Sequence, residues 1–223
     1  MKQGEPSVES RVPLNRERVL HAAVALADGR GIELLTMRAL GEELGVEAMS
    51  LYYYVANKDE LLDGMVDLVY SEIELPSREA DWKVAIRRMA MSAREAFSRH
   101  RWAITLMETR TRPGPANLRH HDSVIGCLRG AGFSIKQAIH AFSLLDSYVS
   151  GFALQELTMP FDTSEELADA AESILRQFPA AEYPHLAETI TEHVTKSGYD
   201  YADEFKVGLD LILDGIERLR DTA

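Results

Sequence analysis

The chain has 223 residues, of which 46% are hydrophobic and 27% charged, and its formal net charge is −12. This length allows one large domain or two small ones with a buried core. The excess of acidic side chains argues against a protein that binds nucleic acid over its whole surface. The single cysteine, Cys127, excludes an intrachain disulfide framework and is typical of a reducing cytoplasm. We interpret it as a packed helix residue, with a reactive thiol as the alternative.

The first 13 residues are polar and contain prolines, which predicts a flexible arm and no signal-peptide core. No apolar run approaches the roughly 20 residues needed to cross a bilayer. We therefore expect no membrane partner and a cytoplasmic location. A first helix is predicted over residues 14–31, with Asn15 as its cap, glycines at its end and an apolar stripe formed by Val19, Ala22, Ala23, Leu26 and Ala27.

Residues 36–58 predict two short helices joined by a tight turn. Met37, Leu40 and Leu44 recur on one face of a helix, and Thr36 is placed to cap it. Gly45 follows directly, where a sharp turn favours a residue that tolerates positive φ. The next helix is predicted to run from about residue 47 or 48 to residue 54, with its apolar positions 51 and 55 facing inward.

The second of these helices carries the chemistry expected of a DNA reader. Its three consecutive tyrosines point about 100° apart on a helix, so at least one must face solvent or a partner. Small residues, hydroxyls and apolar groups suit close approach to a duplex, phosphate contacts and thymine methyls. Asn57 is predicted to cap a third helix that starts with Lys58, where an ammonium and backbone N–H groups could meet one phosphate. The candidate DNA-binding residues are Thr36, Arg38, Ala48, Met49, Ser50, Tyr52, Tyr53, Tyr54 and Lys58. An ordinary helical hairpin with exposed tyrosines also fits the periodicity.

Residues 1–60 hold seven basic and ten acidic side chains, which is an unfavourable balance for a DNA-binding segment. Phosphate binding depends on local placement, so basic and acidic groups can face opposite ways. We expect modest non-specific affinity that falls quickly with salt. The same balance motivates an alternative, in which a helical ligand-binding or scaffold module keeps this fold without binding DNA.

The third helix is predicted to continue to Pro76, and the boundary between two domains is placed at residues 76–77. Beyond it the chain is predicted to be helical over residues 81–100, 101–109, 115–130, 134–157, 164–178, 184–197 and 201–219. Ser134 is predicted to cap the helix that it begins. The last helix has apolar residues at steps of four and three, a seam suited to another helix. Gly208 and Gly215 share one face and would let a neighbouring backbone come close. This helix either docks within its own chain or joins residues 134–157 in a self-interface, for which the candidate residues are Phe142, Val149, Phe205, Leu209, Ile212, Ile216 and Leu219.

Two clusters carry metal-like chemistry, the run His120-His121-Asp122 and a second set in which His185, Glu188 and Glu192 share one helical face. The further members of the second set are Glu182 and His193. Mixed Glu/His faces of helices are usually solvated, so no metal ligands are assigned. The sequence has no nucleophile elbow, phosphate-binding glycine loop or H-E-x-x-H motif. We therefore predict no catalytic residues, no cofactor and no enzyme activity.

The order of motifs resembles a known family. Thr36-Met-Arg-Ala-Leu, Leu44-Gly-Val, Ser50-Leu-Tyr-Tyr-Tyr-Val and Asn57-Lys-Asp-Glu-Leu-Leu resemble the signature of the TetR family of bacterial transcriptional regulators over about residues 15–75. Residues 204–217 resemble the C-terminal domain of the tetracycline-repressor type. The resemblance implies an all-α fold with an N-terminal three-helix helix-turn-helix DNA-binding domain over 14–76 and a C-terminal helical ligand-binding and dimerisation domain over 77–223. It also implies a homodimer, a palindromic double-stranded DNA operator and a repressor released by a small-molecule effector.

In members of the tetracycline-repressor type, a histidine shortly before a Thr-Arg-Pro loop ligates the magnesium of the bound drug. The corresponding stretch here, residues 104–109, contains no histidine, so recognition of a tetracycline–magnesium complex is not expected. The soft and aromatic side chains of the domain predict an apolar or aromatic effector instead. The candidate wall residues, each of which could equally be core, are Met89, Phe97, Trp102, Met107, Phe142, Tyr148 and Phe152.

Overall fold

A computed structural model describes residues 13–77, 80–107, 109–161, 163–196 and 198–221, and within these ranges the chain forms helices and no strand. The predicted all-α class is confirmed. Most of the predicted arm, residues 1–12, lies outside the described residues. The α-helices are α1 (Arg16–Arg30), α2 (Met37–Leu44), α3 (Ala48–Leu51), α4 (Lys58–Glu72), α5 (Trp82–Arg99), α6 (Ala103–Met107), α7 (Pro115–Gly130), α8 (Ile135–Thr158), α9 (Ser164–Gln177), α10 (Pro184–Thr189) and α11 (Tyr201–Asp221).

Four predicted helix caps are confirmed. Asn15 accepts a hydrogen bond from the Arg18 N–H of α1 at 2.8 Å, and Thr36 accepts one from the Ala39 N–H of α2 at 3.0 Å. Asn57 accepts from the Glu60 N–H at 2.8 Å, so α4 begins at Lys58 as expected. Ser134 caps α8 with a capping box completed by the side chain of residue 137. Each cap satisfies a backbone donor that would otherwise lack a partner at the start of its helix.

The turn between α2 and α3 depends on two glycines. Gly45 has a φ of 66°, which confirms the positive φ expected there. Gly41 in α2 lies so close to the next segment that a Cβ on it would fall 2.8 Å from the Val46 carbonyl oxygen. This close approach was not predicted, because it joins residues on either side of the turn. It sets α3 tightly across α2.

Several predicted helix bounds were wrong. α3 ends at Leu51 and not at residue 54, since the N–H groups of Tyr52 and Tyr53 bond to carbonyl oxygens three residues back in a tighter turn. α4 ends at Glu72, ahead of Pro76. A short 3-10 helix, Ile32–Leu34 (η1), was missed. The helix predicted over residues 184–197 is α10 followed by a π-helix, Ile190–Val194 (η2), and its expected last residue lies outside the described residues.

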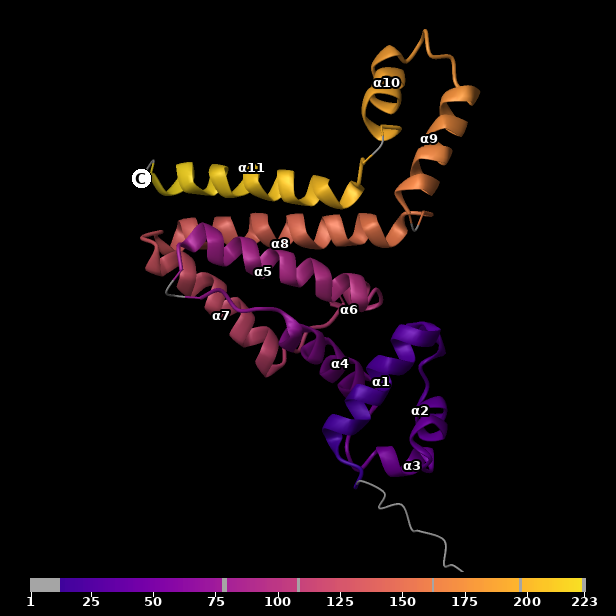
Figure 1. Cartoon of the computed structure of the whole chain (residues 1–223). Coiled ribbons are helices and arrows are strands. Elements are labelled where there is room, and N and C mark those ends of the chain that lie inside the picture. Colours follow the sequence, from indigo (N-terminus) through magenta and orange to yellow (C-terminus); the bar gives the residue numbers. More distant parts are fainter. Residues whose placement is uncertain (1–12, 78–79, 108, 162, 197, 222–223) are drawn as a thin grey trace, which may run out of the picture.

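The C-terminal helices form a layer in which α8 and α11 lie side by side and α5 runs along them (Figure 1). α9 and α10 project from this layer, whereas α1, α2 and α3 gather at the far end of α4 (Figure 1). Buried apolar side chains of both parts belong to one continuous core cluster. α4 therefore joins the N-terminal helices to the C-terminal layer through packed contacts.

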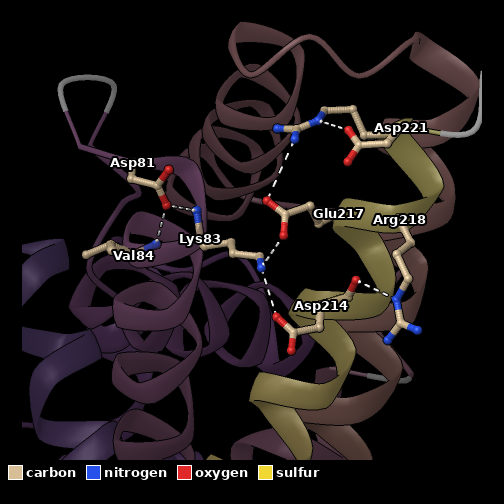
Figure 2. A network of polar contacts seen from close by, with 8 residues as sticks. Asp81, Lys83, Val84, Asp214, Glu217, Arg218 and Asp221 are labelled. Atoms are coloured by element: carbon tan, nitrogen blue, oxygen red, sulfur yellow. Dashed lines mark hydrogen bonds and ion pairs between the residues drawn. The ribbon is translucent and has the colours of Figure 1, made fainter.

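Charged contacts hold α11 against α5. Figure 2 shows the Lys83 ammonium between two carboxylates of α11, with Nζ 2.8 Å from Asp214 Oδ1 and 2.5 Å from Glu217 Oε2. Hydrogen bonds to Asp214 and Glu217 raise the pKa of Lys83, and the same contact with Lys83 lowers the pKa of Asp214. Arg87 pairs with Asp210 one turn further along. These pairs fix the face that α11 turns toward its own chain.

Candidate functional site

The exposed face of α3 and the turn after it carries large side chains. Tyr53 is 89% exposed and Met49 is 73% exposed, and Tyr52 is also exposed. Tyr54 is half-buried against the core, and Ala48 and Ser50 are half-buried as well. The prediction that at least one tyrosine faces solvent is confirmed. Leu51 and Val55 are buried, so they anchor this face from below.

The basic groups of this face have different surroundings. Lys58 is exposed at the first residue of α4, beside backbone N–H groups that lack helical acceptors. Arg38 is exposed, and its Nε lies 2.9 Å from Glu42 Oε1 on the same helix. Thr36 is exposed, and its hydroxyl oxygen accepts the capping bond. The structure therefore leaves Lys58 exposed at the start of α4, and Arg38 and Thr36 exposed at the start of α2.

The C-terminal domain contacts α4 at several points along its length. Asp67 on α4 accepts hydrogen bonds from the Ala116 and Asn117 N–H groups, at 2.8 and 2.9 Å, in the first turn of α7. A carboxylate is favoured there by the free donors and by the helix dipole. Gly114 permits this contact, because a Cβ on it would fall 2.3 Å from Asp67 Cγ.

Arg110 makes a second contact between the C-terminal domain and α4, nearer the start of α4. Its Nη1 lies 3.2 Å from Asp59 Oδ1 and 3.4 Å from Asp63 Oδ1. Asp59 is exposed, whereas Asp63 and Arg110 are partly buried. Arg110, in the loop before α7, thus contacts the first turn of α4 at Asp59 and the second turn at Asp63.

His100 makes a third contact, between the two domains. It is 7% exposed, and its Nδ1 lies 2.9 Å from Asp28 Oδ1 on α1, while Nε2 lies 3.1 Å from Glu72 Oε1 on α4. The indole N–H of Trp102 donates to the same Asp28 oxygen at 2.7 Å. Although burial acts to raise it, hydrogen bonds from Arg99 and His100 hold the pKa of Glu72 below its usual value. We call these residues the interdomain joint.

A small cavity, the inner chamber, lies between α4, α5, α7 and α8. Its volume is about 30 Å³, enough for a water-sized group. The wall is mostly apolar. Its residues are Tyr70, Ile73, Met89, Ala93, Phe97, His120, Val124, Phe142, Leu145, Asp146, Val149 and Ser150.

A larger and more polar cavity, the outer chamber, adjoins the inner one, and the two share Tyr70, Asp146 and Ser150. Its volume is about 520 Å³, within the range of about 300–1,000 Å³ usual for small-molecule sites. Its further wall residues include Asp67, Asp63 and Arg110, which form contacts between α4 and the C-terminal domain. The further wall residues are Asp63, Val66, Asp67, Met107, Arg110, Thr111, Arg112, Pro113, Gly114, Asn117, Leu118 and His121.

The predicted wall residues lie in four places. Met89, Phe97 and Phe142 line the inner chamber, and Met107 lines the outer one. Trp102 belongs to the interdomain joint. Tyr148 stacks on Phe205 of α11 with ring centroids 5.3 Å apart, and Phe152 packs on the same ring, so both serve the core between α8 and α11.

Sequence reasoning missed most of the polar wall, including Asp67, Arg110 and Asp146. His120 and His121 were noticed only as a metal-like pair. The structure turns these neighbours to different cavities, His120 to the inner chamber and His121 to the outer one. Among the described residues, no group of three or more His, Cys, Asp or Glu side chains is placed to hold a metal ion.

His120 is a buried polar side chain in the wall of the inner chamber. It is 8% exposed, and its ring lies 5.4 Å from that of Tyr70. Burial, with a smaller contribution from His121, lowers its pKa to about 4, so the imidazole is neutral at pH 7. Within the described part of the chain, only two buried side-chain atoms lack a hydrogen-bond partner, His120 Nδ1 and Arg110 Nε. Both residues line the chambers.

Most of the residues proposed for a dimer interface face inward. Phe205, Leu209 and Ile216 are at most 1% exposed and pack within the chain, whereas Ile212 and Leu219 are half-buried. Phe142 and Val149 line the inner chamber. Gly208 is approached by the Tyr148 hydroxyl and not by a neighbouring backbone. Exposed apolar side chains remain on the outer sides of α8 and α11, at Ile135, Ile139, Leu144, Leu154, Val207 and Leu211.

None of the helices that the structure describes is long and apolar enough to cross a membrane.

Known protein families match both parts of the chain. Residues 19–65 match the family described as "Bacterial regulatory proteins, tetR family", and residues 75–220 match "Tetracyclin repressor-like, C-terminal domain". The HTH-type transcriptional repressor DrrR1 of Streptomyces coeruleorubidus is 33% identical over 96% of this chain and 81% of its own length.

Solved structures agree with these matches. Apo ActR from Streptomyces coelicolor superposes with a TM-score of 0.78 and 28% identity, covering 95% of this chain and 98% of its own. ActR in complex with actinorhodin gives a TM-score of 0.77 and 29% identity, covering 93% and 98%. The similarity therefore spans both the exposed α3 face and the chambers.

Proposed function

The chain belongs to the tetR family of bacterial regulatory proteins, and from this premise we propose that it is a homodimeric repressor that binds a palindromic operator and is released by an apolar or aromatic effector. The α3 face, with Thr36, Arg38 and Lys58, reads DNA in this proposal. The two chambers take the effector. As a member of this family the protein is a DNA-binding regulator and not an enzyme.

One observation carries the proposal: α4 is at once the support of the DNA reader and a wall of both chambers. Lys58 begins the helix beside the reader, and Asp63, Asp67 and Tyr70 further along it line the cavities. A ligand in the outer chamber would touch the groups that fix α4 to the C-terminal domain. Any ligand that prefers one position of α4 shifts the population of that position.

The proposed effector follows from the walls. Met89, Phe97 and Phe142 supply apolar and aromatic surface at the inner end, and polar groups at the outer end can fix an orientation. ActR, a relative with the same fold, is known in complex with actinorhodin and with (S)-DNPA. This relative supports binding of a small molecule by the present chain.

The proposed dimer uses the exposed sides of α8 and α11, because the seam first considered is filled by the chain's own helices. Leu211 is 66% exposed and Val207 is 57% exposed, one turn apart on α11. Burial of such a patch against its symmetric copy is the usual solution for a homodimer. Two readers in a dimer would contact half-sites about 34 Å apart or a multiple of this.

DNA binding is tested by a band shift on palindromic DNA from the neighbourhood of the gene, at 50 mM salt. Tyr53→Ala combined with Lys58→Ala should weaken binding at least about thirtyfold, since one stacking or apolar contact and one phosphate contact are lost. Tyr183→Ala combined with Lys136→Ala is the matched control, because both residues are exposed outside the reader. Equal binding by the two double variants, or no binding by the wild type, would refute the proposal.

The dimer is tested by sedimentation velocity. Leu211→Glu should yield monomers at micromolar concentration, because a charge would be buried at the centre of the interface. Leu34→Glu, which alters an equally exposed leucine of the N-terminal part, should leave the dimer intact. A Leu211→Glu protein that stays dimeric would place the interface elsewhere.

A further inference from the structure

The inner chamber combines an apolar wall with an unsatisfied imidazole. Met89, Phe97 and Leu145 are apolar parts of the wall, whereas His120 Nδ1 has neither solvent nor a hydrogen-bond partner. An unpaired buried polar atom destabilises the fold, because its lost hydration is not replaced by a hydrogen bond. A group that supplies the missing hydrogen bond therefore gains an unusually favourable site.

The size of the chamber restricts this group. A volume of about 30 Å³ holds a hydroxyl or carbonyl oxygen but no further ring. The adjoining outer chamber, at about 520 Å³, can hold the body of a small aromatic molecule. Tyr70, Asp146 and Ser150 border both chambers, so the chambers adjoin, and a ligand that occupies both must pass between these three side chains.

The charge state of the imidazole restricts the group further. His120 is neutral at pH 7, because burial lowers its pKa to about 4. A neutral imidazole offers one N–H donor and one nitrogen acceptor, and it lacks the charge that would favour a carboxylate. The matching partner is an uncharged oxygen, either a phenolic hydroxyl or a quinone-type carbonyl.

We propose that His120 is the residue that selects the effector, by hydrogen bonding to an uncharged oxygen substituent at the inner end of an aromatic ligand whose body lies in the outer chamber. Arg110, whose buried Nε also lacks a partner, is placed to meet a second oxygen at the outer end. This inference rests on the proposed function, because it assigns the chambers to the effector. It adds the chemical class of the ligand and the residue that distinguishes it.

The test compares 1-naphthol with 1-methylnaphthalene, which have similar size and differ by a hydroxyl against a methyl group. Their dissociation constants are measured at pH 7 by quenching of tryptophan fluorescence. His120→Phe should shift the ratio of the two constants about tenfold toward the methyl compound, since one buried hydrogen bond is lost. His120→Gln keeps a donor and an acceptor and should shift the ratio less.

His121→Phe is the matched control, because it makes the same change at the neighbouring position, which faces the outer chamber. It should leave the ratio within about twofold of the wild type, even if both constants change. A ratio that is the same in the wild type, His120→Phe and His120→Gln would overturn the proposal. If His120→Phe does not fold, the wild type alone decides: a wild type that binds 1-methylnaphthalene as tightly as 1-naphthol overturns the proposal.

A band shift on the same preparations separates this inference from the proposed function. If the ratio shifts as expected but the wild type binds no operator, His120 selects the ligand as proposed and the proposed repressor function is wrong. If 1-naphthol releases operator equally well from the wild type and from His120→Phe, the repressor function stands and the role of His120 fails.

Discussion

The proposed DNA reader and the proposed effector chambers are built in opposite ways. The reader places Tyr53, Met49 and Lys58 in solvent on one short stretch of chain, and buried Leu51 and Val55 fix that stretch. The inner chamber takes its wall from α4, α5, α7 and α8, and the outer one from α4, α6, α7, α8 and the loop before α7. In these walls His120 Nδ1 and Arg110 Nε are buried. A change in the reader therefore alters contacts with a partner, whereas a change in a chamber wall also alters the fold.

The contrast explains why α4 is the connection between them. The reader packs on α2, and α1 packs on both α2 and α4, so α4 is connected to the reader through these helices. α4 is held by Asp67 at α7, by Arg110 and by the interdomain joint. In the proposed mechanism, a ligand that disturbs one of these contacts moves the reader without touching DNA, and ligand and operator binding are linked by a coupling free energy.

The largest effect is expected where the reader itself is tightly packed. Gly41→Val would place side-chain atoms against the Val46 carbonyl and the Ala48 N–H, which are backbone atoms that cannot turn aside. We expect a loss of about 3 kcal/mol in the free energy of unfolding and loss of operator binding. Gly29→Val, at a helical glycine with nothing within 4 Å, should change urea unfolding little. Equal unfolding curves for the two variants would contradict the tight turn.

The chamber wall should show a pH dependence that the reader lacks. The pKa of His120 is about 4 in the folded chain and about 6.5 when unfolded. Because its folded pKa is lowered, the unfolded chain binds more protons between these values, and stability falls as pH falls. From pH 7 to pH 5 the wild type should lose about 2 kcal/mol more than His120→Gln. Urea unfolding at the two pH values measures the difference, and parallel losses would show that His120 is not buried as a neutral ring.

The interdomain joint should have a smaller effect on stability. His100→Leu removes the partner of Asp28 and Glu72, which are both partly open to water and can be hydrated. We expect a loss of about 1–2 kcal/mol and weaker release of operator by 1-naphthol. His140→Leu alters an exposed histidine of α8 and serves as the control in thermal unfolding. Unchanged release by the His100→Leu protein would remove the joint from the coupling.

The smallest effect is expected at the surface network of Figure 2. Lys83→Met removes the ammonium between Asp214 and Glu217, where water and salt screen the attraction. The melting temperature should fall slightly at low salt and match the wild type at 1 M salt. A large loss that persists in high salt would mean that packing of the side chain, and not its charge, holds α11.

The features that the sequence predicted well are local ones. Asn15, Thr36, Asn57 and Ser134 cap their helices because each bonds to a backbone group only three residues away. Gly45 was predicted for the same reason, since a positive φ is a property of one residue. The helix bounds failed where such a signal was missing, as at Tyr52 to Tyr54.

The chambers could be predicted only in part, because their walls join distant segments. Trp102 and Tyr148 have the composition of wall residues, but the first bonds to Asp28 and the second stacks on Phe205. His120 gave a signal as a histidine on a helix, but only the fold shows that Nδ1 lacks a partner. The hydrogen bond from α7 to Asp67 joins residues 49 positions apart, and no local sequence pattern predicts it.

The most direct test of the coupling through α4 is the affinity of 1-naphthol for free and for operator-bound protein, measured for the wild type and for Asp67→Ala. Reciprocity requires that operator weaken 1-naphthol binding by the same factor by which 1-naphthol weakens operator binding. We predict a common factor of about five or more in the wild type and a smaller one in Asp67→Ala, which frees α4 from α7. Equal affinity of 1-naphthol for free and operator-bound wild type would contradict the account.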